Sequence, residues 1–261
     1  MPKVKDFPRK PSQTTTEPIQ NTEPIEKIAT PVPELHPQWQ SLNLAELLTA
    51  PTAFLSISQN NSLYHPDGAQ GKEKQWERPS LENTIKVAQA ARKAGAYFFW
   101  IGYEVFRESY PRSPLDEAQY RFWTASYQDW SDEKKRWDGE LVDELKAINQ
   151  PGDVEFFETA LQSSFVGTEL PLYLGRLGIR NLIITGIHLD WCIEGNARAA
   201  RDYGLIPIVI GDACACQHQE DEPAALRRIN TFFAPVISAD TAVQLLQQAT
   251  ALRASRLQGD R

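Results

Sequence analysis

The sequence predicts an α/β fold in which helices cover both faces of a doubly wound, mainly parallel sheet. Two observations support this prediction. Short apolar runs alternate along the chain with segments of helical periodicity, as expected for repeated strand–helix units. In addition, residues 96–103 are apolar at almost every position, which is typical of a strand that is covered on both faces.

The expected elements follow one another after residue 50. Residues 52–58 are rich in β-branched and aromatic side chains and lead into the turn-prone segments 59–61 and 66–68, which predicts a strand. Ser80 is a suitable N-cap for a helix that ends at Gly95. The remaining predicted elements are strands at 96–103, 181–187, 205–210 and 236–238 and helices at 139–148, 170–177, 192–203, 223–233 and 241–252.

Composition excludes several classes of protein. Hydrophobic residues make up 41% and charged residues 23% of the chain, which is ordinary globular usage. The formal charge of −7 argues against a nucleic-acid partner, because phosphate binding needs concentrated positive charge. No apolar run approaches the roughly 20 residues of a membrane span, and the start lacks a signal-peptide core. We therefore expect a cytoplasmic protein with no membrane contact.

The chain divides into a tail and one domain. Eight of the 18 prolines fall within residues 1–38, which contain no glycine and one aromatic residue, so we expect a disordered tail there. Residues 39–255 then form a single domain. Within it, the irregular stretch 104–152 carries several tryptophans among many charges and is interpreted as an insertion or lid.

Cys192 is the candidate nucleophile. Residues 182–204 run from a buried strand through a short turn into a helix, whose first turn contains Cys192. The helix dipole and the unpaired amides of that turn lower a thiol pKa and can stabilise an oxyanion. Ligands of doubly wound sheets also bind at this end of the strands. A small cysteine that merely packs the strand–helix junction fits the same spacing.

This segment resembles the signature of the isochorismatase-like cysteine hydrolases, which include nicotinamidases, N-carbamoylsarcosine amidases and ureidoacrylate hydrolases. Residues 163–170 and 59–68 resemble two further motifs of that family, Ser-Ala-Phe-x-Gly-Thr-x-Leu and Asp-x-Gln-Asn-Asp-Phe. The resemblance covers roughly residues 50–245 and implies hydrolysis of a small amide or related C–N bond by a homo-oligomer. The signature positions that match are Gly186, Cys192, Ile193, Ala197, Arg198, Ala200 and Gly204.

The resemblance implies a catalytic Asp, Lys and Cys, but two of these positions are substituted. Ile57 stands where the family has Asp, and Thr159 stands where it has Lys. The candidates for a replacement base are Glu158, His188 and Asp190. Each also has a structural interpretation: Glu158 as a solvated charge, His188 as a buried hydrogen-bonding residue, and Asp190 as a helix cap.

The same residues are compatible with other functions. The pocket suits a different reaction, such as lyase or vinyl ether chemistry, although relatives with that activity rely on the missing Asp. A divergent pseudoenzyme that binds a small molecule or a protein partner is the main alternative to the hydrolase. Trp191 and Phe165 are the predicted pocket residues.

No cofactor and no metal are predicted. The chain contains no glycine-rich phosphate loop. Nicotinamidases of the family bind a metal through an Asp and histidines near the first turn, where this chain has His65 and Asp67. Cys214 and Cys216 are expected to point to opposite faces of a strand and to pack, rather than to share a ligand.

Overall fold

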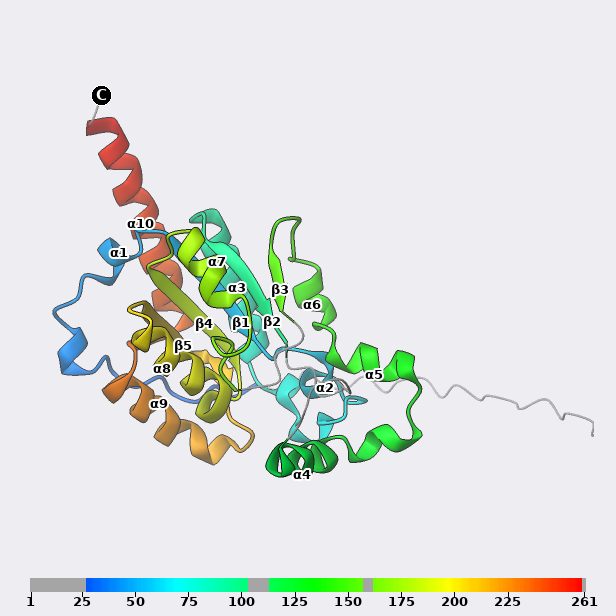
Figure 1. Ribbon diagram of the computed structural model, residues 1–261. Coiled ribbons are helices and arrows are strands. Elements are labelled where there is room, and N and C mark those ends of the chain that lie inside the picture. Colours follow the sequence, from blue (N-terminus) through cyan, green and yellow to red (C-terminus); the bar gives the residue numbers. More distant parts are fainter. Residues whose placement is uncertain (1–26, 103–112, 157–161, 260–261) are drawn as a thin grey trace, which may run out of the picture.

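The computed structural model describes residues 27–102, 113–156 and 162–259, and a six-stranded parallel sheet forms its centre (Figure 1). The strand order is β3-β2-β1-β4-β5-β6, and every neighbouring pair is parallel. The chain therefore starts in the middle, builds one half of the sheet and then the other. The strands are β1 (Thr52–Ile57), β2 (Tyr97–Ile101), β3 (Val154–Phe156), β4 (Asn181–Ile187), β5 (Ile206–Ala215) and β6 (Val236–Ile237).

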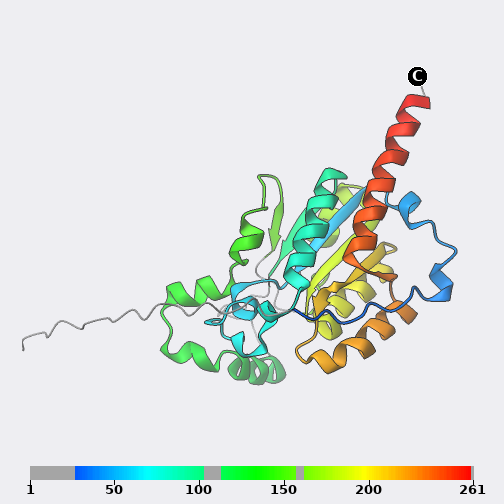
Figure 2. The same ribbon diagram turned by 180° about the vertical axis from the view of Figure 1, so that it is seen from behind.

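Helices cover both faces of this sheet (Figures 1 and 2). Alternate residues of a strand point to opposite faces, so Phe98 and Trp100 of β2 enter one core layer while Phe99 and Ile101 enter the other. The predicted doubly wound α/β fold is confirmed. The first layer contains α1 (Leu44–Leu47), α3 (Ser80–Lys93), α6 (Asp143–Lys146) and α10 (Ala239–Gly259); the second contains α7 (Leu170–Arg176), α8 (Glu194–Asp202) and α9 (Glu222–Phe232).

The two central strands create the crevice of the fold. β1 and β4 pair with each other, but the chain after β1 leads to α3 on one face, while the chain after β4 leads to α8 on the other. Doubly wound sheets bind ligands at such a point, beyond the carboxyl ends of the strands. The two segments that begin here are residues 58–79, called the β1–α3 loop, and residues 188–193, called the β4–α8 turn.

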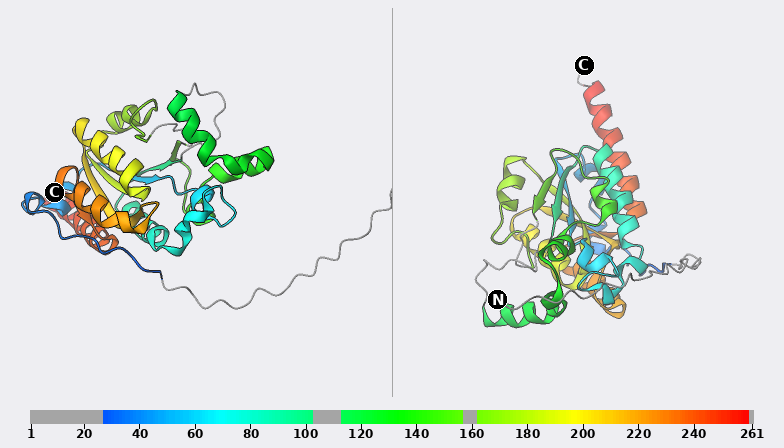
Figure 3. Two further views of the ribbon diagram at one scale, coloured as in Figure 1. Left: turned by 90° about the horizontal axis from the view of Figure 1, so that it is seen from below. Right: turned by 90° about the vertical axis from the view of Figure 1, so that its right-hand side faces the viewer.

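Most of the predicted elements are present, and β4 occupies the predicted residues 181–187. The predicted helix at 139–148 is wrong. α5 (Asp132–Gly139) ends where that helix was expected to begin, because Leu141 forms an antiparallel bridge with Asn60 and holds the backbone extended before α6 starts. Together with α4 (Pro114–Trp123), α5 lies beside α2 (Asn61–Tyr64) at one end of the sheet (Figures 1 and 3).

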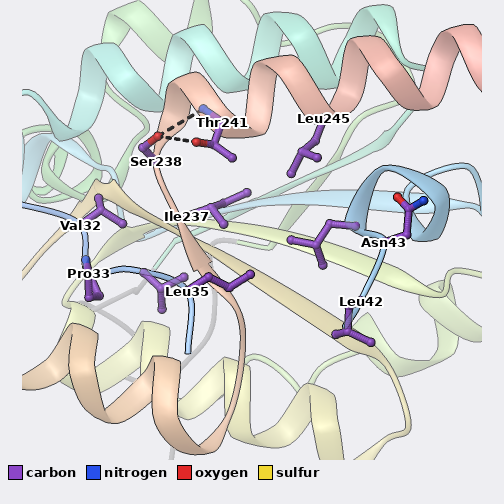
Figure 4. A pocket seen from close by; sticks show the side chains of 11 residues that line it. Val32, Pro33, Leu35, Leu42, Asn43, Ile237, Ser238, Thr241 and Leu245 are labelled. Atoms are coloured by element: carbon purple, nitrogen blue, oxygen red, sulfur yellow. Dashed lines mark hydrogen bonds between the residues drawn. The ribbon is translucent and has the colours of Figure 1, made fainter. Parts of the chain in front are cut away.

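Residues 27–43, here called the arm, lie against the body, so the fold begins before the predicted tail boundary at residue 38. Val32 packs against the second core layer, and Trp39 Nε1 donates a hydrogen bond to Asn230 O over 2.6 Å. Between the arm and α10 lies an apolar groove of about 500 Å³, shown in Figure 4. Its apolar side chains include Leu35, Leu42, Ile237 and Leu245.

Cys214 and Cys216 lie in the same core layer as free thiols. The expectation that they face opposite sides of the sheet was wrong, because residues two apart on a strand share a face. Within the described ranges, no helix combines the length and the apolar character that a membrane span requires.

Candidate active site

Cys192 lies at the crevice between β1 and β4. Cys192 belongs to a short π-helical turn, Leu189–Ile193, and α8 begins only at Glu194. The prediction that Cys192 lies in the first turn of the α-helix was therefore wrong. Desolvation raises the pKa of the Cys192 thiol to about 11, although hydrogen bonds from the His188 backbone and the Ser58 hydroxyl act against this shift. The thiol is therefore protonated at neutral pH.

Gly186 explains how β1 and β4 come so close at the carboxyl end of β1. It adopts a φ of 120°, which disfavours any residue with a side chain. A Cβ atom at this position would lie 2.0 Å from the carbonyl oxygen of Ile57. The glycine of the matched signature thus permits the contact between the two central strands.

A small cavity adjoins Cys192. Its volume is about 20 Å³, which is room for about one water molecule. The lining side chains come from the end of β4, the β1–α3 loop, α4, the segment before α7 and the β4–α8 turn. Because the cavity is so small, entry of a substrate requires one of these walls to move. The lining residues are Ser58, Leu63, Gln70, Trp123, Gln162, Ile187, His188, Trp191 and Cys192.

His188 shares this cavity and is held by a buried carboxylate. Its Nε2 lies 2.7 Å from Oε2 of Glu73, and the two side chains are 6% and 2% exposed. Gln75 Nε2 donates to the same carboxylate oxygen over 3.2 Å and so fixes its position. A neutral imidazole that donates Nε2–H to a carboxylate retains the basic lone pair on Nδ1. The cavity of Cys192 thus contains an imidazole that a buried carboxylate holds in place.

Two tryptophans form an aromatic wall beside this imidazole. The Trp191 ring stacks on the His188 ring with 6.2 Å between centroids, and the Trp123 ring lies 5.7 Å from Trp191. Trp191, which was predicted to be a pocket residue, lines this cavity. Phe165 does not line the cavity: it is buried and packs against the ring of Tyr203 at 5.2 Å.

None of the other predicted site residues that the structure describes lines the cavity of Cys192. Ile57 is 1% exposed and joins the same core layer as Cys192, so the position of the family Asp is filled by an apolar side chain. Asp190 is exposed and does not line the cavity; its negative charge raises the pKa of Cys192. Glu158 and Thr159 lie outside the described residues.

Several residues of the site carry no signal in the sequence. Glu73 stands between two lysines and is typical of an exposed charge, yet it is buried against His188. Ser58 and Gln70 belong to a polar loop, and only the tryptophan content of the insertion indicates a role for Trp123.

The residues at the position of the nicotinamidase metal site do not fit a metal. His65 Nδ1 accepts a hydrogen bond from Asp67 N over 3.1 Å, and both side chains are largely exposed. The described parts of the chain contain no group of three or more His, Cys, Asp or Glu residues arranged to hold a metal ion.

Solved structures of several other proteins share this fold. A cysteine hydrolase from Pseudomonas syringae pv. phaseolicola 1448A has a similar structure, with a TM-score of 0.65, 18% identity, and coverage of 80% of this chain and 95% of its own. An N-carbamoylsarcosine amidase from Thermoplasma acidophilum gives a TM-score of 0.55 and 21% identity, and covers 73% of this chain and 97% of its own. A pyrazinamidase/nicotinamidase from Streptococcus mutans UA159 gives a TM-score of 0.54 and 21% identity, and covers 71% of this chain and 99% of its own.

These identities are low, so the structural similarities establish the fold. The family is established by the sequence itself, because the profile described as the isochorismatase domain matches residues 52–241, more than half of the chain. This protein therefore belongs to the isochorismatase family.

Proposed function

We propose that this protein is a cysteine-dependent hydrolase of a small amide or a related C–N bond, in which His188 replaces the family carboxylate as the base. The observation that supports this most directly is that His188, paired with buried Glu73, lines the same cavity as Cys192. Nucleophilic catalysis requires a base next to a weakly acidic thiol, and a third group that orients the base.

The proposed reaction begins from the neutral thiol. Because burial holds the pKa of Cys192 near 11, a base must take the proton as sulfur attacks the substrate. His188 Nδ1 accepts this proton while Cys192 Sγ bonds to the carbonyl carbon. The resulting imidazolium lies against the Glu73 carboxylate, which stabilises its charge.

The second half of the reaction returns the protein to its starting state. The imidazolium gives its proton to the leaving amine as the C–N bond breaks, which leaves a thioester on Cys192. A water molecule then loses a proton to His188 and attacks the thioester carbonyl. The carboxylic acid product leaves and the thiol is restored.

A binding protein without turnover is the second candidate. The burial of Cys192 and the replacement of the family Asp by the apolar Ile57 both favour it. The two candidates differ in whether Cys192 forms a covalent bond with a substrate.

A panel of small primary amides and ureas, screened for released ammonia, separates the two candidates. We expect turnover by the unmodified protein, and a loss of about 10⁴-fold or more in Cys192→Ser, as for other catalytic nucleophiles. His188→Gln should lose about 10²- to 10⁴-fold. Cys214→Ala, which alters a buried thiol that does not line the cavity, is the matched control and should retain turnover. Turnover that persists in Cys192→Ser would contradict the proposal.

A further inference from the structure

Gln70 lines the cavity of Cys192 and carries a buried acceptor without a hydrogen-bond partner among the described residues. The residue is 4% exposed, and this acceptor is its Oε1. Its backbone is fixed, because Gln70 N donates to Ser62 O over 3.0 Å. A buried acceptor without a donor is unfavourable, and a ligand that supplies an N–H removes that cost.

The charges around the cavity favour an uncharged ligand over an anionic one. None of its nine described lining residues is a lysine or an arginine. His188 does not provide a net positive charge either, since it is paired with the Glu73 carboxylate. Against the described lining residues, an anionic ligand would therefore lose its hydration without gaining a counter-charge. The rings of Trp123 and Trp191 accommodate an uncharged group instead.

We propose that Gln70 is a specificity-determining residue whose Oε1 accepts an N–H of an uncharged substrate. The site then selects amides and ureas over esters of the same shape, because an ester leaves the buried oxygen of Gln70 unpaired. The inference rests on the proposed function in one respect, namely that the cavity of Cys192 is the substrate site. It does not require turnover.

Two alkylating reagents of nearly equal shape test this inference. Iodoacetamide carries N–H donors and methyl iodoacetate carries none. With either reagent the Cys192 thiolate bonds to the CH₂ carbon and iodide leaves, so the thiolate fraction cancels from the ratio of the two rates. The rates are measured on the full chain at pH 8.5 by mass spectrometry of the peptide that contains Cys192, and the ratio is divided by the same ratio for N-acetylcysteine.

We expect a normalised preference for iodoacetamide of about tenfold, the factor for one hydrogen bond to a buried group. Gln70→Leu should reduce it to about one. Gln70→Glu retains an acceptor oxygen, so it should keep the preference even if the leucine variant folds poorly, and it should slow alkylation by the anionic reagent iodoacetate. Gln89→Leu, an exposed position on α3, is the matched control and should leave the ratio unchanged.

A normalised ratio near one in the unmodified protein, or a ratio that Gln70→Leu does not alter, would overturn the inference. A ratio below one would also overturn it, since it would mean that Gln70 presents its amide nitrogen. Failure of the proposed function is distinguishable, because the preference would then persist without release of ammonia from any amide.

Discussion

The two segments that meet at Cys192 are held in place by different forces. The β4–α8 turn is anchored by apolar burial, since Leu189 and Ile193 are fully buried. The β1–α3 loop is buried to a similar degree at Gln59 and Gln75, but there the buried groups are polar. Packing thus positions Cys192, and hydrogen bonds position the polar groups of the loop around it.

The hydrogen bonds of the β1–α3 loop connect it to the rest of the fold. Gln59 Nε2 donates to Thr84 Oγ1 of α3 over 3.1 Å. At the other end of the loop, Arg78 donates to Cys216 O and to the carboxylate of Glu222, each over 2.6 Å. Four experiments test this division between an apolar and a polar half of the site.

The largest expected effect is the pH dependence of Cys192 alkylation. Because burial in the apolar half sets its pKa at about 11, the rate with iodoacetamide should rise roughly tenfold per pH unit, or about 10³-fold from pH 7 to pH 10. Cys214 and Cys216 should react more slowly than Cys192 at each pH, because burial raises their pKa values further. Peptide mass spectrometry gives the three rates.

The control for this measurement is the urea-unfolded chain, in which the rate at Cys192 should level off above an ordinary thiol pKa of about 8.5. A plateau below pH 9 in the native protein would mean that the Cys192 thiol is already ionised there. Apolar burial would then not set its pKa.

Arg78→Ala tests the polar half. It leaves the Glu222 carboxylate buried without its cation, so the free energy of unfolding should fall by about 3–5 kcal/mol in urea denaturation. Arg121→Ala removes an exposed ion pair with Glu117 and should cost at most about 1 kcal/mol. Equal losses in the two variants would show that the β1–α3 loop is not anchored through Arg78.

Glu73→Gln tests the connection between the two halves. The carboxylate that orients His188 is lost, and turnover of any substrate found in the screen should fall roughly 10- to 100-fold, as expected for a hydrogen bond to a charged group. Glu77→Gln, in the adjacent turn, is the control and should retain turnover. Unchanged turnover in Glu73→Gln would argue against a positioning role for Glu73.

Trp123→Ala should have the smallest effect. Its ring closes the cavity from α4, a helix with no buried residue, and it contacts the rings of His188 and Trp191. Loss of these contacts should raise the alkylation rate of Cys192 about two- to tenfold. Phe122→Ala, on the same helix but 69% exposed, should not change the rate. A slower reaction in Trp123→Ala would mean that the tryptophan helps to bind the reagent.

The sequence predicted the fold better than the site because the fold depends on local patterns. Strand β4 is a continuous apolar run and was placed correctly. The helix expected at 139–148 failed for a non-local reason, since the bridge between Asn60 and Leu141 interrupts it. β3 was missed because three residues are too few to show a period.

By itself, the sequence determined the parallel α/β architecture, the strand–turn–helix segment around Cys192 and the family. Hydrophobic periodicity and a contiguous motif are sufficient for these. Only the tertiary structure decided what surrounds the thiol: Glu73 reaches His188 across 115 residues, and Ser58, Gln70 and Trp123 come from separate segments. The physical reason is that a polar side chain is buried only where another segment supplies its partner, and one stretch of sequence does not contain that information.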